Sequence, residues 1–125
     1  MKIGNIKFKA KRLDNGEWVE GDLVRSITPI RICTPHSIFP DIPIVHRVDP
    51  DTVCMFTGLK DCKGNEIWEH DLLQSRETRA IYEVVWDENG GFIIKNSVGG
   101  GHLLNFLGSI LSVFNFKVVG NKYTR

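Results

Sequence analysis

The chain lacks a long apolar run, an excess of charge of one sign and a signal peptide. Its 125 residues carry 16 basic and 15 acidic side chains, so the formal net charge is +1 and no whole-molecule field attracts nucleic acid or membranes. No stretch approaches the roughly 20 apolar residues that a membrane-spanning helix needs, and residues 1–7 lack an apolar core. These absences predict a cytoplasmic protein with no membrane partner.

Cysteine is sparse, and no motif for a metal or a cofactor is present. Cys33, Cys54 and Cys62 are odd in number and contain no C-x-x-C pair, which predicts free thiols. Cys33 and His36 have a spacing found in zinc sites, but a second such pair is missing. The glycines at 99–101 lack the Lys-Ser/Thr of a phosphate loop, so they predict a flexible connector.

Proline is absent outside one segment. Pro29, Pro35, Pro40, Pro43 and Pro50 are all the prolines of the chain. Because proline donates no hydrogen bond to a sheet, residues 28–50 are predicted to be irregular, with short or edge strands at 30–33 and 44–48.

What the sequence has in abundance is the pattern of β-strands. Residues 6–11 alternate apolar and lysine side chains, which predicts a strand with one buried face. Asn15-Gly16 predicts a type I′ hairpin turn and a returning strand at 17–20. Gly21-Asp22 predicts a break before a strand at 23–27. Further strands are predicted at 52–57, 66–68, 72–74, 80–86, 92–95 and 116–119.

The period changes near the C-terminus. Apolar residues between Leu103 and Phe114 recur with helical spacing, which predicts one amphipathic helix packed on the sheet. The predicted fold is mainly β (α+β): a small SH3-like barrel, or two partly open β subdomains with one C-terminal helix. We expect one domain over 1–125, with possible subdomains at 1–47, a β hairpin region, and 48–125, a β barrel with the helix.

A short repeat also lies within the chain. Residues 18–24 recur as residues 67–73, with Glu20 matching Glu69 and Asp22 matching Asp71. Each copy predicts a strand, a Glu-x-Asp turn and another strand, with the Asp side chain capping the turn. Whether the repeat reflects duplication stays open.

The central segment resembles a known family. Residues 48–71 read VDPDTVCMFTGLKDCKGNEIWEHD and are similar to the signature of the YopX family of phage and prophage proteins, typically FTGLKDKNGKEIYEGD. Residues 6–21, the VVWD at 84–87 with its Gly-Gly-Phe hairpin, and the VVGN at 118–121 also resemble family segments. Two departures are His70, where the family has glycine, and the tail at 122–125.

The resemblance implies a β-rich fold and a phage or prophage origin. It implies no known activity, so it assigns no catalytic residue. The residues themselves also indicate no catalytic or metal site. The acidic group around His70, formed by Glu66, Glu69 and Asp71, has no second histidine at ligand spacing. We expect a turn-capping Asp71 and solvated glutamates. Trp18, Trp68 and Trp86 are expected in the core or between strands.

One candidate binding surface remains, a basic stripe. Lys7, Lys9, Lys11 and Arg12 lie along the first strand, with Trp18 near them in the hairpin. Such a stripe can bind a nucleic-acid backbone while the ring stacks on a base. The alternative is a solvated face whose lysines protect an edge strand.

The sequence therefore favours a non-enzymatic protein-interaction module that binds an unknown protein partner or itself. The alternative is a nucleic-acid-binding module that uses Lys7, Lys9 and Lys11. An enzyme is the third and least favoured class, since no catalytic set is present and fold alone does not choose a function.

Overall fold

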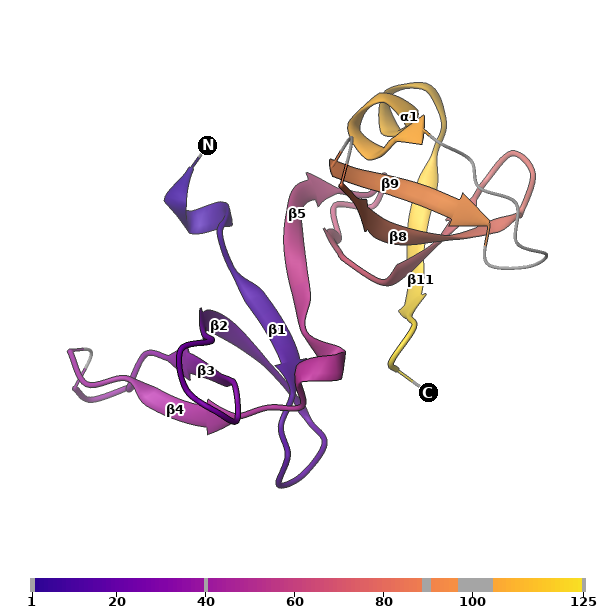
Figure 1. The fold of residues 1–125 in the computed structure, drawn as a ribbon. Helices are drawn as coiled ribbons and strands as arrows, with labels where there is room; N and C mark the ends of the chain where they lie inside the picture. Colours follow the sequence, from indigo (N-terminus) through magenta and orange to yellow (C-terminus); the bar gives the residue numbers. More distant parts are fainter. Residues whose placement is uncertain (1, 40, 89–90, 97–104, 125) are drawn as a thin grey trace. The chain divides into compact units, whose positions relative to one another are not determined.

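The computed structural model describes residues 2–39, 41–88, 91–96 and 105–124. The chain divides into two units, Met1–Phe56 and Thr57–Arg125. Both consist mainly of antiparallel strands, with a single short α-helix in the described part of the second unit (Figure 1). Within the described residues, no helix is long and apolar enough to cross a membrane.

The first unit holds one antiparallel sheet. Its strands lie in the order β4-β3-β2-β1-β5, and β5 continues past Phe56 to pair with β6. Their bounds are β1 Phe8–Lys11, β2 Trp18–Val24, β3 Arg31–Thr34, β4 Ile44–Arg47 and β5 Cys54–Lys60, with 3-10 turns at η1 Ile3–Asn5 and η2 Pro50–Thr52.

One face of this sheet forms the core of the first unit. Ala10, Ile32 and Val48 are fully buried there. Partly buried side chains pack around them: Phe8, Val19, Leu23, Ile30 and Val53. The alternation along β1 explains the arrangement, because Phe8 and Ala10 point inward while the lysines point to the opposite face. The strand predicted from period two is confirmed.

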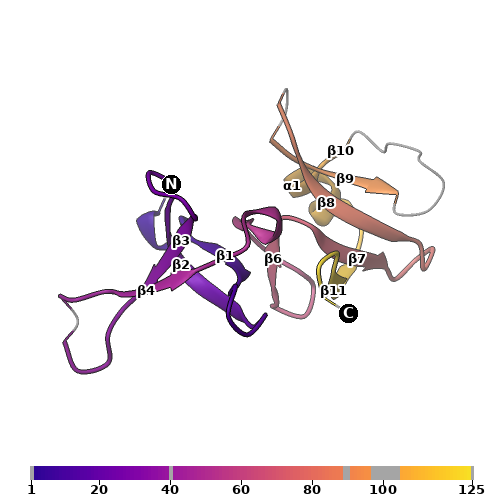
Figure 2. The same cartoon turned by 60° about the horizontal axis from the view of Figure 1, so that its bottom comes forward.

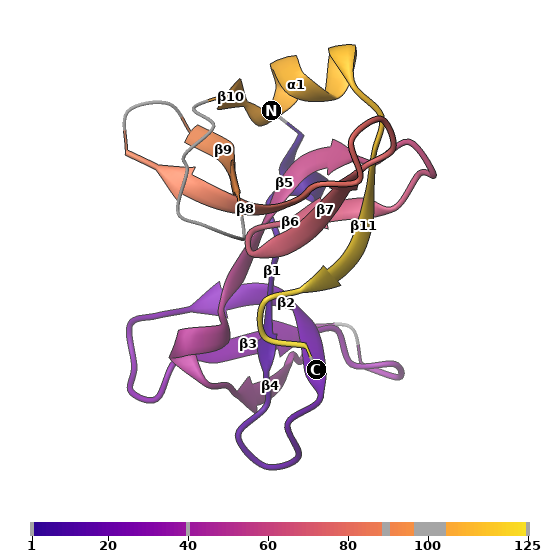
Figure 3. The same cartoon turned by 90° about the vertical axis from the view of Figure 1, so that its right-hand side faces the viewer.

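The second unit holds a five-stranded antiparallel sheet in the order β10-β9-β8-β7-β11. The elements of the unit are β6 Glu66–Trp68, β7 Asp71–Ser75, β8 Ile81–Asp87, β9 Gly91–Asn96, β10 Asn105–Phe106, α1 Leu107–Val113 and β11 Phe116–Asn121. Figure 3 shows β11 running beside β7, with which it pairs. The core consists of Ile67, Leu73, Val84, Ile94, Leu107 and Phe116.

The predicted fold class is confirmed: the chain is mainly β, with two antiparallel sheets and one short C-terminal helix. No closed barrel forms within the described residues. Of the two predicted architectures, the structure therefore has the open one. Each unit instead has its own cluster of buried apolar residues.

Two predictions for the first hairpin were wrong. Gly21 and Asp22 do not break a strand but lie inside β2, where a Cβ at Gly21 would stand 2.1 Å from the backbone oxygen of Cys33. Glycine is needed there for close approach of β3, not for a turn. At the tip, Gly16 has a positive φ but Asn15 does not, so the turn is not type I′. The Asn15 side chain instead accepts a hydrogen bond from the Glu17 amide.

The predicted helix is shorter than its pattern. Asn105 and Phe106 pair with Ile94 and Ile93 as β10, and α1 begins only at Leu107. Strand pairing thus overrides the helical period at these two positions. Leu103, Leu104 and the predicted glycine connector at 99–101 lie outside the described residues.

Candidate functional site

The signature segment builds a tightly bonded hairpin around Asp61. This side chain is 7% exposed and accepts hydrogen bonds from the backbone amides of Lys63 and Asn65 at 2.9 and 2.8 Å. It also accepts from Asn65 Nδ2 at 3.2 Å and from the Val118 amide of β11 at 2.9 Å. Burial raises the pKa of Asp61, but these donors outweigh burial and hold the pKa below its ordinary value.

Other signature residues shape the same hairpin. Gly58 and Gly64 have φ values of 82° and 84°, which favour glycine. The Thr57 hydroxyl donates to the Ile67 carbonyl at 2.6 Å. Asp71 is buried and accepts from the Trp68 amide at 2.8 Å, so it caps the turn as predicted. The signature therefore specifies structure in this chain.

The acidic group around His70 is also structural. His70 has a φ of 69°, the left-handed conformation that glycine adopts readily. Its Nδ1 lies 3.0 Å from Glu83 Oε2 and its Nε2 lies 3.7 Å from Glu69 Oε2. Its ring meets Tyr123 edge-on, with the centroids 5.2 Å apart. Gly21, the matching residue of the repeat, lies within a strand, so the two copies of the repeat differ in structure.

No metal centre is formed in the part of the chain that the structure describes. Cys33 is half-buried, Cys54 is buried and Cys62 is exposed, and all three are free thiols as predicted. His36 Nδ1 accepts hydrogen bonds from the amides of Ile38 and Phe39, so this ring caps the β3–β4 loop.

The tryptophans pack as predicted, in the core or between strands. Trp68 is buried. Trp86 is 51% exposed but meets Phe92 edge-on across β8 and β9, with the centroids 5.0 Å apart. Trp18 lies beneath two lysines of the basic stripe.

The lysines of the predicted stripe lie over aromatic rings. Lys7 Nζ stands 4.7 Å from the Phe56 centroid, and the ammonium groups of Lys9 and Lys11 stand 4.9 and 5.7 Å from Trp18. Lys7 also pairs with Glu20 at 3.5 Å. Arg12 follows the end of β1, and its guanidinium donates to Asp14 at 2.6 Å. The structure thus brings the three lysines together on one face and directs Arg12 to a local partner.

Strand register extends this face beyond the predicted stripe. Asp22 pairs with Cys33 and Val24 with Arg31, and Arg31 in turn pairs with Arg47. Lys11 pairs with Trp18, and Val24 lies on the same face of β2 as Trp18 because side chains alternate along a strand. Directly opposed residues share a face of a sheet, so Arg31 and Arg47 lie on the lysine face. These two arginines were missed from the sequence, because only the strand register relates them to β1.

A second feature of the first unit is an apolar hairpin at the edge of its sheet. Figure 2 shows the β3–β4 loop extending beyond the strands. Ile38 is 72% exposed, Phe39 58%, Ile42 60% and Val45 51%. Ile44, the first residue of β4, is exposed as well. We call these five residues the apolar hairpin.

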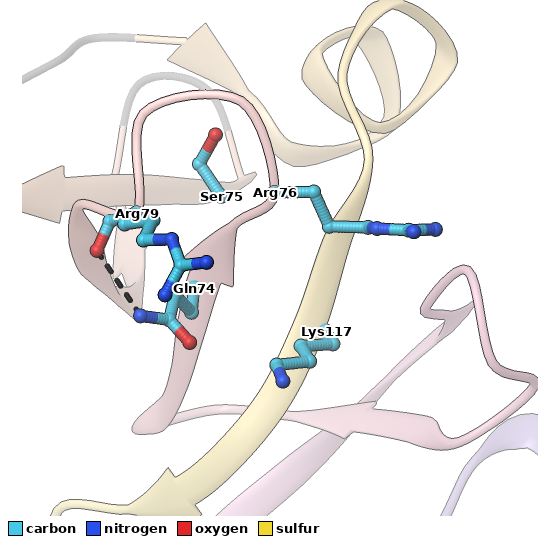
Figure 4. Close-up of a pocket in the computed structure, with 5 residues that line it drawn as sticks. All are labelled: Gln74, Ser75, Arg76, Arg79 and Lys117. Carbon is cyan, nitrogen blue, oxygen red and sulfur yellow. Dashed lines mark hydrogen bonds between the residues drawn. The ribbon is translucent and has the colours of Figure 1, made fainter.

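The second unit contains a basic pocket that sequence reasoning missed. It has a volume of about 280 Å³ and is lined by Gln74, Ser75, Arg76, Arg79 and Lys117 (Figure 4). The loop between β7 and β8 supplies both arginines, and β11 supplies the lysine. The sequence showed only a polar loop here, because the distant Lys117 joins it through the β7–β11 pairing.

Comparison with protein families is consistent with this architecture. The family model described as YopX protein matches residues 7–125. The comparison with curated proteins gave no match. Because the match covers nearly the whole chain, including the hairpin around Asp61, this chain belongs to the YopX family.

Proposed function

We propose that the protein is a non-enzymatic interaction module of a phage or prophage, acting in the cytoplasm of the bacterial host. The observation that carries the proposal is the apolar hairpin, which exposes Ile38, Phe39, Ile42, Ile44 and Val45 at one edge of a sheet. Exposed apolar side chains concentrated in one short segment are typical of protein-binding surfaces.

The edge strand suggests how a partner binds. Within the described residues, β4 pairs with β3 and with no other strand, but the Leu13 amide already donates to the Arg47 carbonyl at 3.0 Å, so the open part of this edge lies at Ile44 and Val45. An end strand presents backbone donors and acceptors to which an extended peptide can add as a further strand. Many proteins protect such edges with charge, yet β4 begins with Ile44 and Val45. We therefore propose an extended segment of a partner protein as the ligand.

The charges on β4 suggest the composition of that segment. The side chains of Val45 and Arg47 lie on the same face of the sheet. Arg31 stands opposite Arg47 on β3. The Arg31 guanidinium also donates to the Pro29 carbonyl. A partner strand that pairs with the open part of β4 and places an apolar residue against Val45, with an acidic side chain near the Arg47 guanidinium, fits this face.

The test is capture of partners by tagged protein from a prophage-carrying lysate, with and without nuclease. Phe39→Ser and Val45→Lys alter the apolar hairpin, and Ile3→Ser removes an apolar side chain that is 85% exposed but lies outside it. A partner that survives nuclease, is retained by Ile3→Ser and is lost with both hairpin variants supports the proposal. Equal capture of the partner by the unaltered protein and all three variants contradicts the proposal. Turnover of a defined substrate by the purified protein also contradicts it.

The same variants test self-association. Light scattering is measured across protein concentrations for the unaltered protein and for Val45→Lys. A dimer that Val45→Lys dissociates makes a second copy the partner of β4. A monomer at every concentration removes self-association and leaves a different protein as the partner.

A second candidate function is nucleic-acid binding by the lysine face. It is favoured by the register that adds Arg31 and Arg47 to Lys7, Lys9 and Lys11, and by the neighbouring Trp18 ring. The opposing observations are that Glu20 pairs with Lys7 and that the same register places Asp22 on this face. Anisotropy of a labelled single-stranded oligonucleotide should fall steeply with salt and be lost in Lys9→Glu/Lys11→Glu, but not in Lys63→Glu. No binding at low salt removes this candidate.

A further inference from the structure

The basic pocket of the second unit carries an inference that is independent of the apolar hairpin. Gln74 and Lys117 stand opposite each other on paired strands, and Arg76 and Arg79 come from the adjoining loop. Figure 4 shows Arg79 beside Gln74 and Lys117 below them, while Arg76 extends across β11. Three cationic residues from two elements of the fold therefore line the pocket, but the guanidinium of Arg76 is directed away from Arg79 and Lys117.

No carboxylate in the part of the chain that the structure describes neutralises these cations. Among the described residues, the side chains of Arg76, Arg79 and Lys117 form no ion pair with a carboxylate. An anion bound at the pocket would be attracted by cations that no described carboxylate balances. The pocket thus has a net positive charge that a ligand can balance.

The one carboxylate of the loop, that of Glu77, forms no ion pair with Arg76, Arg79 or Lys117. Glu77 accepts hydrogen bonds from the backbone amide and the side-chain amide of Asn115, both at 3.3 Å, and from the Ser75 hydroxyl at 3.1 Å. Desolvation raises the pKa of Glu77, but these donors and its own amide outweigh that effect and hold the pKa below its ordinary value. An anionic Glu77 directed at Asn115 leaves the arginines free for an external anion.

The loop is also held by hydrogen bonds within the protein. Ser75 Oγ accepts from the amides of Glu77 and Thr78, and the Ser75 carbonyl accepts from the Arg79 amide. Arg79 has a φ of 62°, a left-handed conformation that costs a non-glycine residue energy. Such conformations concentrate at binding and catalytic sites. Here the conformation places a guanidinium at the pocket, where glycine would supply none.

We infer that this pocket binds a phosphate group, as inorganic phosphate or as the phosphate of a mononucleotide. The two cations that face the same side of the pocket, Arg79 and Lys117, match a phosphomonoester, which carries close to two negative charges at neutral pH. Arginine matches the oxygens of phosphate with two parallel hydrogen bonds. A volume of about 280 Å³ accommodates such a group and lies at or below the small end of typical ligand sites.

The test is an amide NMR titration of the full chain with inorganic phosphate, against sodium chloride at equal ionic strength. We expect saturable shifts at the β7–β8 loop and β11, and about tenfold or greater weakening in Arg79→Gly and in Lys117→Gln. Glycine suits the left-handed backbone at 79, so the loop should keep its conformation. Lys63→Gln, an exposed lysine outside the pocket, should bind as the unaltered protein does.

Further ligands separate the sources of the phosphate. Tighter binding of adenosine monophosphate than of phosphate makes a nucleotide the ligand, and equal binding makes the phosphate group itself the ligand. Shifts that rise linearly without saturation overturn the inference. So do saturable shifts that persist in Arg79→Gly/Lys117→Gln, or a triglutamate peptide that binds more tightly than phosphate.

Discussion

At the scale of single residues, His70 shows how a left-handed position can be occupied without glycine. Its φ of 69° strains the backbone, while its imidazole lies within hydrogen-bond distance of Glu83 and meets Tyr123. The family resemblance pointed to glycine here, and the structure shows that histidine adopts the backbone conformation that glycine would. The side-chain contacts offset the strain.

This balance predicts an unusual order of stabilities at position 70. His70→Ala keeps the strain and loses the contacts, whereas His70→Gly loses the contacts and relieves the strain. We expect His70→Ala to be less stable than His70→Gly by about 1 kcal/mol. Urea denaturation of the two variants measures the difference, and an alanine variant as stable as the glycine variant would contradict the account.

Asp61 predicts how stability depends on pH. Its pKa is lower in the folded protein than in the unfolded chain, so its contribution is present above the unfolded value and is lost as pH falls through the folded value. The loss therefore lies below about pH 4. Asp61→Asn should cost about 1–3 kcal/mol at pH 7, and the two unfolding curves should converge in acid.

Asp51→Asn is the matched control for this measurement, because Asp51 is exposed and its carboxylate accepts no hydrogen bond from any described residue. It should leave the stability at pH 7 nearly unchanged. A constant difference between Asp61→Asn and the unaltered protein from pH 7 down to pH 2 would refute the proposed role of the charge.

At the scale of elements, a strand and a helix each contain a glycine, but only the strand requires it. Gly21 in β2 allows β3 to approach, since a Cβ there would lie 2.1 Å from the Cys33 carbonyl oxygen. A Cβ added at Gly108 in α1 would meet no described atom within 4 Å, and the φ of Gly108 is not positive. The first needs the absence of a side chain, and the second does not.

Alanine substitution should therefore have opposite effects at the two sites. Gly21→Ala forces backbone apart and should cost about 2–4 kcal/mol. Gly108→Ala should raise the free energy of unfolding by about 0.5–1 kcal/mol, because alanine favours a helix. Thermal unfolding of both variants measures these effects. A destabilised Gly108→Ala would contradict the open space that the structure shows around a Cβ at Gly108.

Strands could be predicted from the sequence where alternation was clear, as in β1. The failures came where a distant strand decided the local structure. β3 makes Gly21 part of a strand, and β9 draws Asn105 and Phe106 out of the predicted helix. The candidate binding surfaces were likewise predicted only where a single strand contained them. The lysines of β1 were visible as a stripe, but Arg31, Arg47 and the basic pocket depend on register between strands.

At the scale of the whole molecule, the two cores are made of separate residues. Ile32 is fully buried in the first unit and Leu73 in the second. Each is expected to cost about 2–5 kcal/mol when changed to alanine. Hydrogen exchange should show lost protection mainly in residues 1–56 for Ile32→Ala and in residues 57–125 for Leu73→Ala. Equal loss throughout the chain for both variants would mean that the units unfold together.

The bond between Asp61 and the amide of Val118 has a consequence for solubility. β11 is an end strand of its sheet, but the Cys62 amide donates to the Phe116 carbonyl and Asp61 accepts from Val118. A chain that tried to stack on β11 would find these groups already occupied. The signature hairpin thus blocks strand-to-strand association through β11. Acid, which protonates Asp61, should weaken this protection and favour fibre growth.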